Sequence, residues 1–113
     1  MEESVTAELP TSLDHYFAAQ NDHDAERMAI CFAPDATVRD EGRNIIGRDA
    51  IRDWKLETIA KYGVGIQPID ATAEGPSVTV IAKVTGNFPG SPVELTYDFK
   101  LDKAGLIHRL EIH

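Results

Sequence analysis

An acidic residue stands at the end of a short strand pattern in the first half of the chain. The run Ala-Thr-Val-Arg-Asp ends at Asp40, and Val38 is its natural inward-facing residue. Because side chains alternate along a strand, Asp40 points to the same side as Val38, and Arg39 to the opposite side. Burial raises the pKa of a carboxylate towards the range that is useful for proton transfer. The same residues also fit a simpler interpretation, in which Asp40 ends the strand in solvent and pairs with Arg43 or Arg48.

Two tyrosines and a histidine lie on faces that the pattern marks as apolar. Tyr16 falls on the apolar stripe of a helical run, Tyr97 in the middle of an alternating strand, and His108 on the face shared by Leu106 and Ile112. A buried phenol hydroxyl needs a hydrogen-bond partner. Each tyrosine could therefore serve a pocket, or fill the core with its hydroxyl bonded to backbone or water. A lone histidine on such a face is either a pocket residue or a satisfied core residue.

Apolar side chains on the same inward faces would form the walls of a pocket around these groups. We predict that the substrate is contacted by Tyr97, His108, Trp54, Phe32, Phe99 and Leu110. Trp54 is also a natural core residue, and the two roles are compatible. Apolar walls with a few convergent polar groups are the usual form of a small-molecule site. A carboxylate base, Asp40, with phenol donors such as Tyr16 suits the removal of a proton beside a carbonyl, because the donors stabilise the developing enolate.

The motifs of several other chemistries do not occur in the sequence. It has no Ser-His-Asp arrangement, no phosphate-binding loop and no Gly-x-Gly-x-x-Gly, so acyl-enzyme, nucleotide and dinucleotide chemistry lack support. The single Cys31 cannot form an internal disulfide or a cysteine-based zinc site, and the four histidines lack metal-binding spacing. We therefore predict that the protein uses no metal and no cofactor.

Composition narrows the class of protein further. The chain has 113 residues, of which 42% are hydrophobic and 27% charged, as in a soluble globular protein. We expect one domain over residues 1–113, with residues 1–8 disordered. The formal net charge of -8 opposes binding to nucleic acid or to acidic membrane surfaces. No apolar run is long enough to span a membrane, and the acidic start differs from a signal peptide, so we expect a cytoplasmic location.

The apolar spacing predicts helices first and strands afterwards. We expect a first helix that stops at residues 20–22, a second from Asp24 to Pro34 with Phe32 on its apolar stripe, and a third between Gly47 and Gly63. Alternation predicts strands at residues 36–40, after Gly65, and at 78–84, 93–101 and 106–112, with Glu41–Ile46 as a loop. Without a repeated β-α-β pattern, this order predicts an α+β fold, in which the helices pack on the concave face of one curved antiparallel sheet.

The segment Phe32-Ala-Pro-Asp-Ala-Thr-Val-Arg-Asp40, followed by Ile46-Gly-Arg-Asp-Ala-Ile51 and Trp54, resembles the nuclear transport factor 2-like superfamily. Within it, the pattern is similar to the SnoaL-like (polyketide cyclase) and ketosteroid isomerase-like branches. The resemblance extends from about Leu9 to Ile112. It implies a cone-shaped, cystatin-like α+β fold, with the curved sheet wrapped around three N-terminal helices.

The resemblance also implies roles for single residues. Asp40 matches the general base of ketosteroid isomerase, and Tyr16 matches the tyrosine that donates to the oxyanion. Tyr97 stands where the family has a carboxylic acid as its second oxyanion donor. Phe32 and Lys55 stand where that enzyme has supporting tyrosines. Relatives of this fold include isomerases, cyclases and plain binding modules, because one fold hosts many functions.

Two functional hypotheses follow. In the first, the protein is an isomerase- or cyclase-type enzyme that acts on a small apolar carbonyl compound with Asp40 as base and Tyr16, with Tyr97, as oxyanion donor. In the second, it is a non-catalytic ligand-binding or dimerisation module of the same fold. A third possibility is a closed interior in which Tyr16 and Tyr97 fill the cone. Because many relatives pair through the outer face of the sheet, we expect a homodimer, with Ile81 and Ile107 on that face.

Overall fold

The computed structural model describes residues 9–40 and 42–113, which form three helices and one six-stranded sheet. The helices are α1 (Thr11–Asn21), α2 (Ala25–Ala29) and α3 (Arg48–Tyr62). The strands are β1 (Phe32–Asp40), β2 (Arg43–Ile46), β3 (Gly65–Glu74), β4 (Ser77–Thr85), β5 (Val93–Leu101) and β6 (Ile107–Ile112). The expectation of disorder for residues 1–8 lies outside the described residues.

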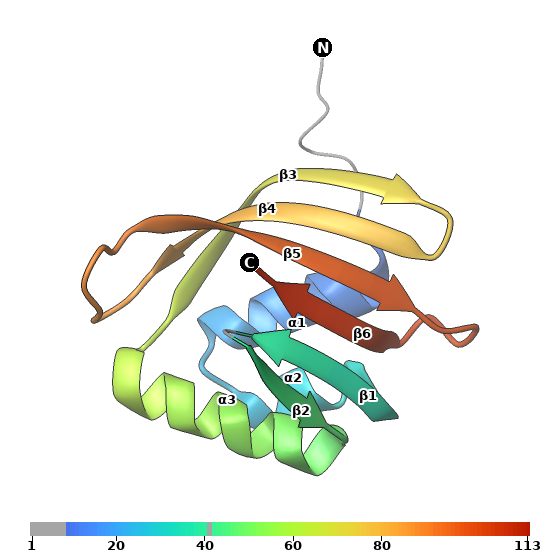
Figure 1. Ribbon diagram of the computed structural model, residues 1–113, viewed down its shortest axis with the longest axis horizontal. Helices are drawn as coiled ribbons and strands as arrows, with labels where there is room; N and C mark the ends of the chain where they lie inside the picture. Colours follow the sequence, from blue (N-terminus) through green and yellow to red (C-terminus); the bar gives the residue numbers. More distant parts are fainter. Residues whose placement is uncertain (1–8, 41) are drawn as a thin grey trace.

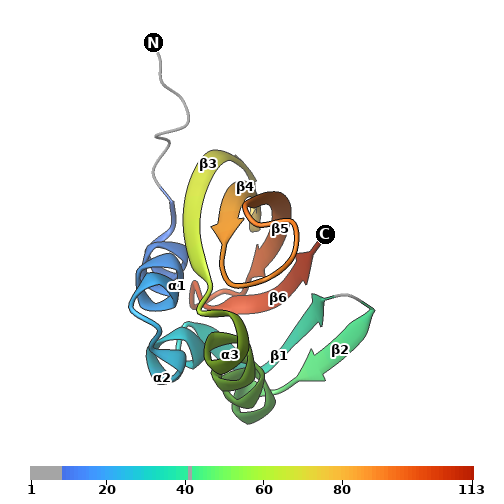
Figure 2. The same ribbon diagram turned by 90° about the vertical axis from the view of Figure 1, so that its left-hand side faces the viewer.

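The sheet curves over the helices and does not close into a barrel (Figure 1). Its strand order is β2-β1-β6-β5-β4-β3, and Figure 2 shows α1, α2 and α3 stacked along its concave side. The sheet needs these helices because the inner side chains of its strands are apolar, as with Val38, Val80 and Phe99. The predicted α+β fold, with helices at the N-terminus and a curved sheet around them, is confirmed.

Helix α3 follows directly from local sequence signals. Gly47, with φ 92°, precedes its first residue, and Gly63 closes it in the left-handed conformation with φ 57° and ψ 47°. The inner face of α3 buries Ile51, Trp54 and Lys55. The predicted third helix is therefore confirmed at both ends, and its buried face includes a lysine.

The second helix is shorter than predicted. Helix α2 spans five residues, with Asp24 as the N-cap whose side chain accepts a hydrogen bond from the backbone N–H of Arg27. The prediction that it continues to Pro34 is wrong, because Phe32 already pairs with Ile107 as the first residue of β1. Pro34 is tolerated inside β1 because the register between β1 and β6 shifts in this part of the strand.

The pairing around β1 also differs from the prediction. Residues 43–46 form β2, antiparallel to β1, where a loop was expected. On its other side β1 pairs with β6 in parallel, so the sheet is not wholly antiparallel. Strand β6 therefore pairs with both β1 and β5, which lie far apart in the sequence. The alternation of apolar residues along β1 or β6 alone does not show that these two strands pair.

A bulge at His108 reverses the expected faces at the start of the last strand, whereas Leu110 and Ile112 are buried as predicted. Lys100 of β5 pairs with Arg109, and Leu101 pairs with Ile107, so His108 is an extra residue in β6. As a result Ile107 is fully buried and His108 is exposed. The predictions that His108 faces the interior and that Ile107 faces outward are both wrong, since each assumed unbroken alternation.

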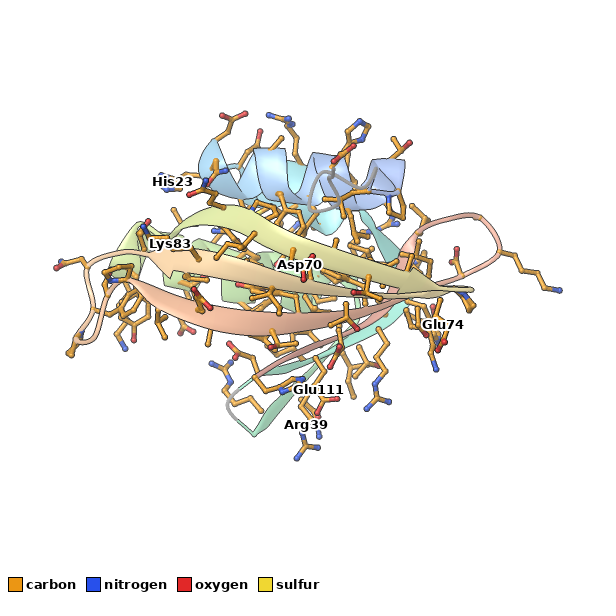
Figure 3. All side chains as sticks on the ribbon, turned by 90° about the horizontal axis from the view of Figure 1, so that it is seen from above. His23, Arg39, Asp70, Glu74, Lys83 and Glu111 are labelled. Carbon is orange, nitrogen blue, oxygen red and sulfur yellow. The ribbon has the colours of Figure 1, made fainter. Side chains whose placement is uncertain are left out.

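The outer face of the sheet is largely polar. Arg39 of β1 and Glu111 of β6, which are neighbours in the β1–β6 register, project from the face opposite α1 (Figure 3). Ile81 is 36% exposed, whereas the other residue on which the dimer interface was based, Ile107, belongs to the core. The expected homodimer stays a prediction, and the outer face offers such an interface less apolar surface than the sequence suggested.

The bulge predicts opposite sensitivities for two adjacent residues. Ile107→Ala should lower the free energy of unfolding by about 2–5 kcal/mol, because it leaves a cavity in the core. His108→Ala should change it by less than about 0.5 kcal/mol, because the side chain is exposed. Urea denaturation of both variants measures this difference. Equal losses, or a larger loss for His108→Ala, would contradict the register described above.

Candidate functional site

A pocket of about 460 Å³ opens between α3 and the strands β4 and β5. Its apolar wall is formed by Trp54, Val64, Val84, Phe88, Leu95 and Ile112. Polar side chains from several elements also line it, and Gln20 of α1, Asp40 of β1, Lys55 of α3 and Tyr97 of β5 are among them. The volume lies within the usual range for small-molecule sites, about 300–1,000 Å³. The combination of apolar walls and convergent polar groups is the one that the sequence analysis predicted.

Some of the predicted site residues line this pocket, and the others lie in the core or on the surface. Asp40, Tyr97 and Trp54 line the pocket. Tyr16 and three of the predicted apolar contacts are buried in the core and are not part of this wall: Phe32, Phe99 and Leu110. His108 is exposed on β6 and does not line the pocket.

Asp40 reaches the pocket because it is the last residue of β1. It pairs with Arg43 of β2 on one side and with Ile112 of β6 on the other. Strand parity turns the preceding Arg39 outward, where it is exposed. The side chain of Asp40 is therefore half-buried at the pocket, as its parity with the fully buried Val38 predicted.

Tyr97 lies on the inner face of β5, and its ring stacks on that of Phe99 with the centroids 6.1 Å apart. It is only 5% exposed. Burial, and secondarily the negative charge of Asp40, raise the pKa of Tyr97 above its ordinary value. The phenol therefore keeps its proton at neutral pH and can donate a hydrogen bond into the pocket.

Tyr16 is enclosed by aromatic rings. Its ring makes edge contacts with Phe17, Phe32 and Phe99, with centroids 5.3–5.8 Å away. Its hydroxyl is buried and has no hydrogen-bond partner among the described residues. Burial raises the pKa of Tyr16, and the nearby charges of Tyr97 and Asp40 raise it further. Buried hydroxyls are usually satisfied, so this unsatisfied donor calls for an explanation.

Lys55 is a candidate functional residue that was not among the site residues predicted from the sequence. Its side chain is 4% exposed, and its Nζ donates a hydrogen bond to Oε1 of Gln20 at 3.1 Å. The same Nζ lies 4.1 Å from the centre of the Trp54 ring and 5.0 Å from that of Tyr16. Burial lowers the pKa of Lys55 from 10.5 to about 7, although the charge of Asp40 acts in the opposite direction.

A signal for Lys55 was present in the spacing. Lys55 follows Ile51 by four residues and precedes Ile59 by four, so it shares the apolar face of α3. A lysine on such a face is unusual, because lysine is almost never fully buried unless it is paired. The resemblance to ketosteroid isomerase matched Lys55 to the position of a supporting tyrosine and implied no role for its amine.

The sequence profile of the SnoaL-like domain matches residues 13–106, which is most of the chain. The chain belongs to the SnoaL-like domain family. This places it in the nuclear transport factor 2-like superfamily and confirms the resemblance stated above. No curated protein sequence matches it.

Solved structures agree with this SnoaL-like assignment. A candidate polyketide cyclase from Sinorhizobium meliloti is 41% identical, with a TM-score of 0.88 over 93% of this chain and 95% of that one. A ketosteroid isomerase-like protein from Catenulispora acidiphila, bound to trimethylamine, is 23% identical, with a TM-score of 0.83 over 94% of this chain and 86% of that one. Rv0760c from Mycobacterium tuberculosis, bound to estradiol-17β-hemisuccinate, is 16% identical, with a TM-score of 0.75 over 91% and 90%.

Two further findings on this SnoaL-like domain concern membrane-spanning helices and metal sites. None of its described helices is both long and apolar enough to cross a membrane. Within residues 9–40 and 42–113, no cluster of three or more His, Cys, Asp or Glu side chains could hold a metal ion.

The buried lysine of this SnoaL-like domain predicts a pH-dependent stability. Between about pH 7 and pH 10.5 the unfolded chain holds a proton on Lys55 that the folded chain has lost, so Lys55 makes stability rise with pH. From pH 7 to pH 9 the gain should be about 2 kcal/mol relative to Lys55→Met, which lacks the titrating group. Urea unfolding of both proteins at the two pH values measures it. Parallel pH profiles would show that Lys55 does not carry a lowered pKa.

Proposed function

We propose that this protein is an isomerase- or cyclase-type enzyme that binds a small apolar carbonyl compound in the pocket beside α3. The proposal rests chiefly on one observation: Asp40 and Tyr97 reach the same pocket from separate strands, and apolar side chains from α3, β4, β5 and β6 form part of its wall. A carboxylate and a protonated phenol are the two groups that proton transfer beside a carbonyl requires. The electrostatic effect of Asp40 on Tyr97 supports their proximity.

In the proposed reaction Asp40 removes a proton from the carbon next to the carbonyl. The electron pair of the broken C–H bond moves towards the carbonyl oxygen, which becomes an enolate. The hydroxyl of Tyr97 donates a hydrogen bond to that oxygen and stabilises the developing charge. In an isomerisation Asp40 then returns the proton to another carbon. In a cyclisation the enolate carbon bonds to a second carbonyl carbon of the same molecule, the π pair moves to that carbonyl's oxygen, and the oxygen takes the proton from Asp40.

The relatives support the class of substrate. A 41% identical neighbour is a candidate polyketide cyclase, and a more distant one holds an estradiol derivative. Both names point to apolar compounds that carry rings and oxygen functions. The apolar part of the pocket wall, with Trp54 and Phe88 on it, suits a ligand of that kind.

The first test replaces the base. Asp40→Asn should slow the exchange of α-protons of a cyclic ketone with deuterated water by about 100-fold or more, because it removes general-base catalysis. Proton NMR of the ketone follows the exchange. The control is Asp35→Asn, since Asp35 is an exposed carboxylate on the same strand and does not line the pocket. Equal rates in the two variants would reject Asp40 as the base.

A second test concerns Tyr16, which we propose as a further oxyanion donor. Its hydroxyl lies in the core without a partner, so Tyr16→Phe should stabilise the fold by up to about 1 kcal/mol. If a bound ligand supplies the missing partner, the same variant should slow exchange by about tenfold. Thermal unfolding and the NMR assay measure the two effects. Greater stability with unchanged exchange would assign Tyr16 to the core alone.

A second candidate function is a binding module without catalysis. It is favoured by the position of Tyr16, which lies in the core rather than on the pocket wall, so that Tyr97 would be the phenol left to face a ligand there. Rv0760c with its estradiol derivative, and a designed 17-OHP binder with a TM-score of 0.77 and 18% identity, have the same fold with a ligand named for each. This candidate predicts that Asp40→Asn leaves ligand affinity unchanged and that the wild type causes no exchange.

A further inference from the structure

We infer that Lys55 is a nucleophilic amine that forms a covalent iminium (Schiff base) with the aldehyde or ketone that enters the pocket. The inference deepens the proposed function, because it rests on the pocket receiving a carbonyl compound. It assigns to a buried lysine a chemistry that neither the family match nor the structural neighbours imply. Three features of the structure support it: the position of Lys55 on the pocket, its neutral hydrogen-bond partner, and the apolar surfaces around its amine.

Lys55 is placed where a ligand can reach it. It lines the same pocket as Asp40, Tyr97 and Gln20, although the residue as a whole is 4% exposed. Its position at the middle of α3 is rigid, because Ile51 one turn earlier and the adjacent Trp54 anchor this helix in the core. A carbonyl group that accepts a hydrogen bond from Tyr97 would therefore enter the pocket that this amine lines.

The hydrogen-bond partner of Lys55 is neutral. Gln20 presents its oxygen to Nζ at 3.1 Å, while its own amide nitrogen donates to the carbonyl oxygen of Val64 at 3.3 Å. The second bond fixes the orientation of the amide, so the oxygen faces the lysine. An amide oxygen can accept from an amine or from an ammonium group, and because it carries no negative charge it favours the charged form of the lysine less than a carboxylate would.

The surfaces around Nζ are aromatic, and burial there opposes the charge. The faces of Trp54 and Tyr16 favour the ammonium form through cation–π contacts. Burial disfavours that form and lowers the pKa of Lys55 to about 7, although the charge of Asp40 acts in the opposite direction. About half of the amines are then neutral at pH 7, and a neutral amine is the form that attacks a carbonyl. The charged or titratable groups around this end of the pocket are Asp40, Arg43, Glu57, Lys61, Tyr62, Tyr97 and Tyr16.

The proposed step joins the amine of Lys55 to the carbonyl carbon and releases water. The lone pair of Nζ forms a bond to the carbonyl carbon, and the π pair moves to oxygen, which takes a proton from Tyr97. The nitrogen returns one of its protons to Tyr97, which gives a neutral carbinolamine. The hydroxyl group then leaves as water with a proton from solvent, and the nitrogen lone pair forms the C=N bond of the iminium. The iminium withdraws electrons more strongly than the ketone, so Asp40 can remove the neighbouring proton more easily and an enamine forms.

Reductive trapping tests the inference. The full chain is incubated with cyclohexanone or pentanal and sodium cyanoborohydride at pH 7, which converts an iminium into a stable secondary amine, and peptide mass spectrometry locates the adduct. We expect Lys55 to be labelled about tenfold or more faster than Lys83, an exposed lysine on β4, because burial lowers the pKa of Lys55 and leaves much of its amine neutral at this pH. Labelling of Lys55 should reach half its maximum near pH 7.

The controls separate chemistry from folding. Both lysines are measured in the same molecules, so a folding defect cannot mimic the preference, and in urea the two should label at equal rates. Lys55→Arg should lose the fast adduct, and Lys83→Met should keep it. Faster labelling of Lys83 than of Lys55 in the folded protein, or a Lys55 profile that follows that of Lys83, would overturn the inference.

Failure of this inference is distinguishable from failure of the proposed function. If α-proton exchange depends on Asp40 but proceeds without trapping at Lys55 and survives in Lys55→Met, the proposed function holds and the Schiff base is rejected. If Lys55 is trapped selectively but exchange does not depend on Asp40, the inference stands and the role of Asp40 as base is rejected.

Discussion

A sheet with one apolar face has to be covered, and in this protein three short helices do the covering. The inner side chains of β1, β4, β5 and β6 form one core with α1 and α3. At the end of the sheet near Tyr62 and Phe88 a hollow remains between the helices and the strands, and the pocket occupies it. The pocket is therefore a consequence of covering a curved sheet with helices of limited length, and residues at its wall face both the core and a ligand.

Polar groups at this boundary carry an energetic cost that a purely structural core would avoid. Lys55 is buried against aromatic rings with a neutral amide as partner, and Tyr16 has a hydroxyl with no partner among the described residues. Replacement of either by an apolar side chain of similar size would remove a desolvation penalty. Perturbed pKa values often occur at functional sites, and for this reason the buried amine of Lys55 on the pocket enters the proposal made above.

Membership of the SnoaL-like family establishes the fold but is compatible with many different reactions. The 41% identical neighbour and the more distant ones share the architecture, but one fold hosts many functions. The reaction proposed for this chain uses the carboxylate of Asp40 at the end of β1 and the phenol of Tyr97 on β5, and the further inference adds the amine of Lys55 on α3.

The sequence by itself determined the bounds of α3 and the inward face of β5, because each depends on local periodicity or on a glycine at a helix end. Tertiary structure decided the parallel pairing of β1 with β6, the bulge that buries Ile107 and exposes His108, and the meeting of Lys55 with Gln20. These features depend on contacts between residues far apart in the chain. Alternation along one strand carries no information about its partner, and a lysine on a helix face shows its pKa only once the groups that bury it are known.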